Sequence, residues 1–125
     1  MTLIIGIDPG SRLTGYGIIS TNNDQLTFLD AGTIRTNSSD ITERIAQIFA
    51  GVSRIVNHYQ KYSNKPIQAA IEQVFMANNP DSALKLGQAR GAAIAALTAQ
   101  DLQVSEYNKR QIKQADSGYG AADKE

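Results

Sequence analysis

The first third of the chain alternates short apolar runs with clusters of turn residues. Leu3–Ile7 is an apolar, β-branched run followed by the turn residues of Asp8–Ser11, a pattern typical of a buried central strand. Further strands are predicted at Thr14–Ile19 and Gln25–Ile34, and Asn22–Asp24 suits the hairpin between them because Asn and Asp tolerate positive φ. Three consecutive strands with no helix between them predict an antiparallel meander.

The apolar period then changes to three and four residues. Apolar side chains recur at this spacing over Ile41–Tyr59 and predict an amphipathic helix of about five turns. Residues 67–74 predict a fourth strand. The pair Asn79–Pro80 marks the start of a second helix that is expected to reach about Gln100. Leu102–Tyr107 predicts a fifth strand.

Small side chains dominate the second predicted helix, where glycine and alanine occupy most positions from Gly87 to Ala96. Such side chains let another backbone approach closely. Two interpretations stay open: tight packing of the helix on the sheet, or contact with a second subunit.

The predicted order β-β-β-α-β-α-β places the chain in the α/β class, as one domain over residues 1–125. It predicts a mixed five-stranded sheet with helices on its faces. A further helix is expected to cover the remaining face, but the sequence ends soon after the fifth strand. We therefore expect a domain that is incomplete at its C-terminus.

Composition excludes several kinds of chemistry. The chain is 42% hydrophobic, which argues against intrinsic disorder. It has no cysteine and only one histidine, His58, which excludes disulfide scaffolds, thiolate nucleophiles and the usual zinc sites. Twelve basic and twelve acidic side chains balance, so contact with a polyanion requires a local basic patch. No membrane-length apolar run or signal peptide is visible, and we expect a cytoplasmic protein without membrane contact.

Two acidic residues are candidate metal ligands. Asp8 ends the first strand, and the nearby Gly10 keeps the adjacent space free of side chains. Glu72 lies in the apolar fourth strand, where a carboxylate is costly to bury unless it is paired or binds a cation. If the strands are neighbours, the two carboxylates suit Mg²⁺, or Mn²⁺ as an alternative, and predict phosphoryl transfer or phosphodiester hydrolysis. The plainer interpretations are a turn residue for Asp8 and a solvent-facing strand residue for Glu72.

Phe75 and several basic residues are candidate nucleic-acid contacts. Phe75 precedes a loop-like stretch, where an aromatic ring can stack on an unpaired base or fold back onto the core. Basic side chains beside a metal site would neutralise DNA phosphates, although such a group is usually only a solvated surface. The basic candidates are Lys85, Arg90, Lys109, Arg110, Lys113 and Lys124.

Four segments, in the same order along the chain, resemble the motifs of the RuvC family of bacterial Holliday junction resolvases. Residues 6–17 (GIDPGSRLTGYG) are similar to its N-terminal signature, and residues 70–76 (AIEQVFM) to its second motif. Residues 81–91 (DSALKLGQARG) resemble the helix that follows, and residues 110–114 (RQIKQ) the basic segment after the fifth strand.

The resemblance implies an RNase H-like fold, a homodimer and Mg²⁺-dependent nicking of four-way DNA junctions at two symmetric sites, in DNA recombination and repair. It also implies cooperation with a branch-migration motor. By motif position, Asp8 and Glu72 match catalytic, metal-binding acids, and Phe75 matches an aromatic that contacts bases. Lys113 and Lys124 match basic residues of the DNA face.

The C-terminus departs from the family pattern. RuvC proteins continue for some tens of residues into a helix with two more aspartates, and neither Asp116 nor Asp123 lies in that acidic motif. We therefore expect little activity from the 125-residue chain. Two alternatives stay open: a catalytically silent module of the same fold that binds branched DNA, and an enzyme on the related actin-like nucleotide-binding fold.

Overall fold

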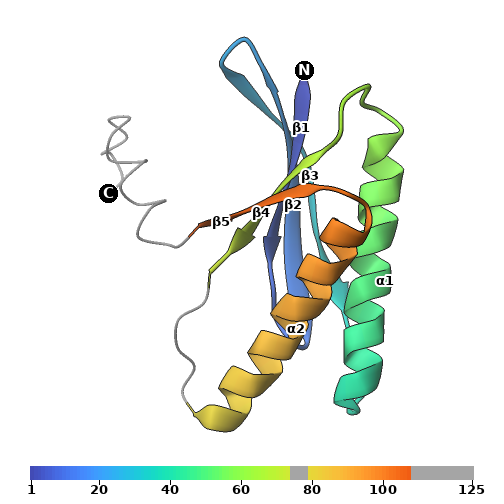
Figure 1. Ribbon diagram of the computed structural model, residues 1–125, viewed down its shortest axis with the longest axis vertical. Helices are drawn as coiled ribbons and strands as arrows, with labels where there is room; N and C mark the ends of the chain where they lie inside the picture. Colours follow the sequence, from blue (N-terminus) through green and yellow to red (C-terminus); the bar gives the residue numbers. More distant parts are fainter. Residues whose placement is uncertain (74–78, 108–125) are drawn as a thin grey trace.

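In the part of the chain that the structure describes, the regular structure is one mixed β-sheet and two helices (Figure 1). The structure, a computed structural model, describes residues 1–73 and 79–107. Its element order confirms the predicted β-β-β-α-β-α-β arrangement. The elements are β1 (Thr2–Asp8), β2 (Leu13–Asn22), β3 (Gln25–Arg35), α1 (Ile41–Gln60), β4 (Gln68–Glu72), α2 (Pro80–Ala99) and β5 (Gln103–Tyr107).

The sheet has the strand order β3-β2-β1-β4-β5. β1, β2 and β3 form the predicted antiparallel meander, whereas β4 and β5 run parallel to β1. Asn23 and Asp24 have positive φ angles of 52° and 69° at the hairpin, which explains the choice of these residue types there. The first strand of the sequence therefore becomes the central strand, flanked by β2 and β4.

Both described helices lie side by side on one face of this sheet (Figure 1). The sequence predicted helices on its faces, and the crossovers explain why these two share one. The connections through α1 and α2 both move in the same direction across the sheet, and right-handed crossovers then place their helices on the same side. Neither described helix is long and apolar enough to cross a membrane.

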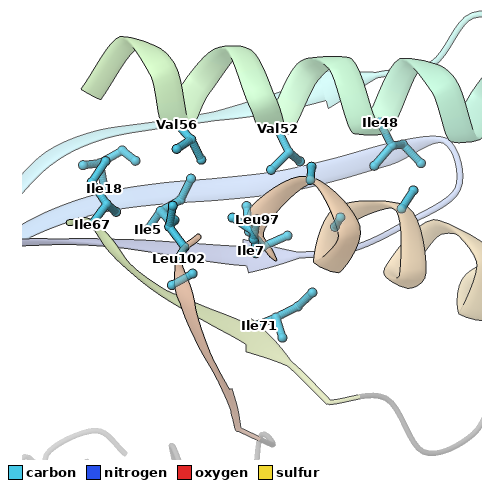
Figure 2. Packing of buried hydrophobic residues seen from close by; sticks show 14 of the residues in the cluster. Ile5, Ile7, Ile18, Ile48, Val52, Val56, Ile67, Ile71, Leu97 and Leu102 are labelled. Atoms are coloured by element: carbon cyan, nitrogen blue, oxygen red, sulfur yellow. The ribbon is translucent and has the colours of Figure 1, made fainter. Parts of the chain in front are cut away.

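The core lies between this face and the helices. Along β1, Leu3, Ile5 and Ile7 are buried, and the residues between them are more exposed, as the two-residue period of a strand requires. Figure 2 shows Val52 and Val56 of α1 directed toward the strands. The other buried apolar residues are Ile18, Ile48, Ile67, Ala69, Ile71, Ala89, Ala92, Ala93, Ala96, Leu97 and Leu102.

The small residues of α2 divide into two sets. Ala89, Ala93 and Ala96 are fully buried in the core, which confirms close packing as one reason for the composition of this helix. Gly87 and Gly91 are exposed, and an added Cβ at either position would meet nothing within 4 Å. Packing within the domain therefore does not explain these two glycines, and contact with a second subunit stays a prediction.

Asparagine and aspartate side chains cap the N-termini of both helices. Asp40 accepts a hydrogen bond of 3.1 Å from the backbone N–H of Thr42 in α1. Asn79 accepts one of 2.8 Å from the backbone N–H of Ser82, and Pro80 occupies the first position of α2, as predicted. These local contacts set where the two helices begin.

Candidate active site

Asp8 and Glu72 stand at the ends of neighbouring parallel strands. The register of β1 and β4 pairs Ile7 with Ile71, so the two acids occupy the next position on their strands. Both isoleucines are fully buried beneath the helices, and successive side chains of a strand point to opposite faces. Asp8 and Glu72 therefore share the other face, which we call the open face because neither α1 nor α2 covers it. The structure brings the two carboxylates to one side of the sheet.

The turn after β1 holds the Asp8 backbone in place. Thr14, which is fully buried, donates a hydrogen bond of 3.0 Å from its hydroxyl to the Gly10 carbonyl, and that hydroxyl accepts one of 3.3 Å from the Gly10 N–H. A Cβ at Gly10 would lie 2.3 Å from the carbonyl oxygen of Leu13, so the turn requires glycine. Gly15 is the partner of Asp8 on β2 and leaves the carboxylate exposed. The Asp-Pro-Gly turn thus fixes the backbone after β1 and leaves the Asp8 carboxylate accessible.

A row of small residues adjoins the acids on the open face. Gly6 pairs with Gly17 on β2 and with Ala70 on β4, so three neighbouring strands carry almost no side-chain volume there. A Cβ at Gly6 would meet nothing within 4 Å. A shallow groove of about 390 Å³ follows, lined by these glycines together with Asp8 and Tyr107. Its floor is backbone, which an extended polymer can approach closely.

Tyr107 is a site residue that the sequence analysis missed. It ends β5, is the register partner of Glu72 on β4, and lines the groove with Asp8. Burial raises the pKa of Tyr107 above its ordinary value of 10.0, and the negative charges of Glu72 and Asp8 raise it further. The phenol is therefore a neutral hydrogen-bond donor beside two acids. Its position at the carboxyl end of a strand parallel to β1 and β4 was the signal that could have found it.

The donor chemistry of this site fits a hard divalent cation. Asp8 and Glu72 offer carboxylate oxygens, and Mg²⁺ is commonly held by one or two carboxylates, with water and phosphate oxygens completing its shell. Residues 1–73 and 79–107 contain no group of three or more His, Cys, Asp or Glu side chains that would hold a metal ion. Within the described residues, Asp8 and Glu72 are therefore the two candidate carboxylate ligands at this edge of the sheet.

The basic candidates on α2 have different surroundings. Lys85 is exposed and forms an ion pair of 3.2 Å with Asp81, one helical turn earlier. Arg90 pairs with Glu106 of β5, and its Nε donates a hydrogen bond of 3.4 Å to the Glu72 carbonyl. The predicted DNA contacts Phe75, Lys109, Arg110, Lys113 and Lys124 lie outside the described residues, as does Val74 of the predicted fourth strand.

The sequence matches the family described as "Crossover junction endodeoxyribonuclease RuvC" over residues 4–125. The chain belongs to the RuvC family. A RuvC relative from Psychrobacter sp. (strain PRwf-1) is 68% identical over 124 residues, which are 99% of this chain and 64% of that protein. One from Acinetobacter baylyi is 70% identical over 125 residues, which are 100% of this chain and 66% of that protein. The chain thus spans about two thirds of the length of these RuvC relatives.

Solved structures agree with this assignment. Thermus thermophilus RuvC in complex with a Holliday junction substrate superimposes with a TM-score of 0.78 at 26% identity, covering 92% of this chain and 69% of that chain. This similarity confirms the RNase H-like α/β fold that the motifs implied. The sequence matches the RuvC family, which does not support the alternative of an enzyme on the actin-like fold.

Proposed function

We propose that this chain forms the nuclease core of a Holliday junction resolvase, which nicks four-way DNA junctions by Mg²⁺-dependent phosphodiester hydrolysis in recombination and repair. The observation that carries the proposal is the placement of Asp8 and Glu72 on one face at the ends of adjacent parallel strands. Membership of the RuvC family supports the reaction class. The Holliday junction bound by the Thermus relative supports the substrate.

In this proposal Asp8 and Glu72 hold the cation. When bound, a divalent cation activates water and stabilises the charge that develops on the phosphate oxygens. The protein supplies position: both acids end rigid strands, so their carboxylates need little rearrangement on binding. The glycine floor of the groove lets a DNA phosphate approach the acids. Tyr107 offers a neutral hydroxyl that can donate to an anionic oxygen there.

Through the family resemblance, Phe75 is assigned to contact bases near the junction centre, and Lys113 and Lys124 to the DNA face. Lys85, Lys109 and Arg110 are proposed as further phosphate contacts from their charge. A homodimer would present two such sites for paired symmetric nicks, and a branch-migration motor is the expected partner in the cytoplasm.

A second candidate function is a catalytically silent module that binds branched DNA. The specific observation in its favour is that the described residues supply two site carboxylates and no cluster of three or more metal-ligating side chains. A metal site with few protein ligands stabilises the transition state less well, so a site with two carboxylates would favour junction binding over cleavage.

The test is a binding and cleavage assay on a synthetic four-way junction with Mg²⁺, run beside the longer Psychrobacter relative. Paired nicks that disappear in Asp8→Asn, with junction binding retained, support the nuclease. Specific binding without nicks by the wild-type chain, while the relative cleaves, supports the silent module. If the chain prefers linear duplex to the junction, both proposals are wrong.

A further inference from the structure

Arg90 occupies a different place from the other basic candidates. Its side chain is 21% exposed, whereas that of Lys85 is 46% exposed. Its guanidinium contacts two strands at once: it pairs with the carboxylate of Glu106 on β5 and donates to the carbonyl of Glu72 on β4. A planar fork of N–H donors can make both contacts from one position, which a lysine ammonium does less well.

These contacts lie on the face of the sheet that the helices cover. Glu106 is the register partner of Ile71, which is fully buried beneath α2, so the Glu106 side chain points toward the helices. Glu72 and Tyr107, one residue further along each strand, point to the open face. Arg90 therefore lies on the covered face, opposite the acidic site. It can influence the acids only through the strand backbone between the two faces.

The strand ends that Arg90 contacts are also joined to each other. The N–H of Gln73 donates a hydrogen bond to the Tyr107 carbonyl, at the last position of the β4–β5 pair. Arg90, Glu106 and this backbone bond together tie α2 to both strands at the point where Glu72 and Tyr107 leave the sheet. Turning the guanidinium toward a DNA phosphate would break the ion pair with Glu106.

We infer that Arg90 is a positioning residue: with Glu106 it clamps the ends of β4 and β5 and thereby holds the Glu72 carboxylate in place for the cation, instead of contacting DNA phosphates. This inference rests on the proposed two-carboxylate site. Residues that orient metal ligands commonly change metal affinity by about 10-fold to 100-fold when they are replaced. Because the clamp acts through the backbone, we expect a change near the lower limit.

The experiment compares Arg90→Met, Arg90→Lys and Glu106→Gln in the full chain, with Arg54→Met on the exposed surface of α1 as the matched control. The first readout is amide exchange at Gln73, which needs neither metal nor DNA. The second is Mn²⁺ affinity, measured from the electron paramagnetic resonance of free Mn²⁺. The third is the salt dependence of junction binding without a divalent cation.

The clamp predicts faster exchange at Gln73 and about tenfold weaker Mn²⁺ binding in both Arg90→Met and Glu106→Gln, with an unchanged salt slope and no rescue by Arg90→Lys. Arg54→Met should match the wild type in all three measurements. If Arg90 instead contacts a DNA phosphate, Arg90→Met lowers the salt slope of junction binding by about one and Arg90→Lys restores it. Glu106→Gln then does not weaken junction binding.

That second pattern overturns the inference, as does unchanged exchange at Gln73 in both variants. Faster exchange with Mn²⁺ affinity equal to wild type also overturns it, because the clamp would then be purely structural. If the wild-type chain does not bind Mn²⁺, the proposed metal site is wrong. Amide exchange at Gln73 alone then decides whether Arg90 and Glu106 hold the ends of β4 and β5 together.

Discussion

The two faces of the sheet use the same strands for different purposes. On the covered face, β1 contributes Leu3, Ile5 and Ile7 to a dry core under the helices. On the open face, the same strand contributes Gly6 and Asp8, and its neighbours add glycine, alanine and a second acid. The covered face supplies the buried core of the domain, whereas the open face carries little side-chain volume beside the two acids. Rigid support for the site therefore comes largely from side chains on the opposite face of the same strands.

Two tyrosines illustrate the same contrast. Tyr59 of α1 lies on the covered side, where its hydroxyl donates a hydrogen bond to the Asp30 carboxylate of β3. That hydrogen bond is the main reason that the pKa of Tyr59 is raised to about 12. Burial is the main cause for Tyr107, followed by the charges of Glu72 and Asp8. Tyr59 joins two elements of structure, whereas Tyr107 lines a groove with Asp8 and pairs in register with Glu72.

The largest expected effect is on stability. It comes from Ile71 of β4, whose side chain points to the covered face, whereas that of its neighbour Glu72 points to the open face. Ile71→Ala removes a fully buried side chain between the sheet and α2, and we expect it to lower the free energy of unfolding by about 3 kcal/mol. Urea denaturation measures this change. Mn²⁺ affinity per folded molecule should stay near that of the wild type. A loss below about 1 kcal/mol would show that this part of the covered face is loosely packed.

Glu72→Gln should show the reverse pattern one residue later. We expect nicking of a four-way junction to fall on the order of 100-fold, because a site that stabilises developing charge loses one of its two carboxylates. Its effect on urea denaturation should be smaller than that of Ile71→Ala. The rate is measured under single-turnover conditions with Mg²⁺. Equal cleavage by wild type and variant would remove Glu72 from the proposed site.

Tyr107→Phe should have a moderate effect confined to the open face. The ring stays and the hydroxyl is lost, so we expect about tenfold slower nicking, which corresponds to one hydrogen bond, with little change in junction affinity. Because the pKa of Tyr107 lies above 10.0, its hydroxyl remains protonated at neutral and mildly alkaline pH. Junction cleavage and gel-shift assays check the prediction. A variant that loses thermal stability but cleaves normally would make Tyr107 a packing residue only.

Tyr59→Phe should have the smallest effect. We expect it to lower the free energy of unfolding at pH 7 by about 1 kcal/mol, because the hydrogen bond to Asp30 is lost. The folded-state pKa of about 12 exceeds the ordinary value of 10.0, so folding favours the protonated phenol. The stabilisation by Tyr59 is thus fully present below pH 10 and is lost as the pH rises through about 12. Urea denaturation of both proteins at neutral pH and near pH 11.5 tests this, since the difference between them should shrink. A difference that grows with pH would contradict the assigned cause.

Much of the fold was predictable because the deciding interactions are local. The apolar run Leu3–Ile7, the Asn-Asp hairpin turn and the cap at Asn79 each act within a few residues, and all appear where the pattern placed them. Element ends were less accurate: β2 extends to Asn22, beyond the predicted Ile19. Pairing with the longer β3 explains this extension, and such pairing is a long-range interaction.

The sequence alone determined the element order and the two acids worth testing, since these follow from periodicity and from the cost of burying a charge. Tertiary structure alone decided that β4 and β5 line up beside β1, which puts Tyr107 next to Glu72 and brings both to the side of Asp8. It also decided that Arg90 contacts Glu106. The physical reason is that register and crossover hand depend on packing between distant segments, which no local pattern records.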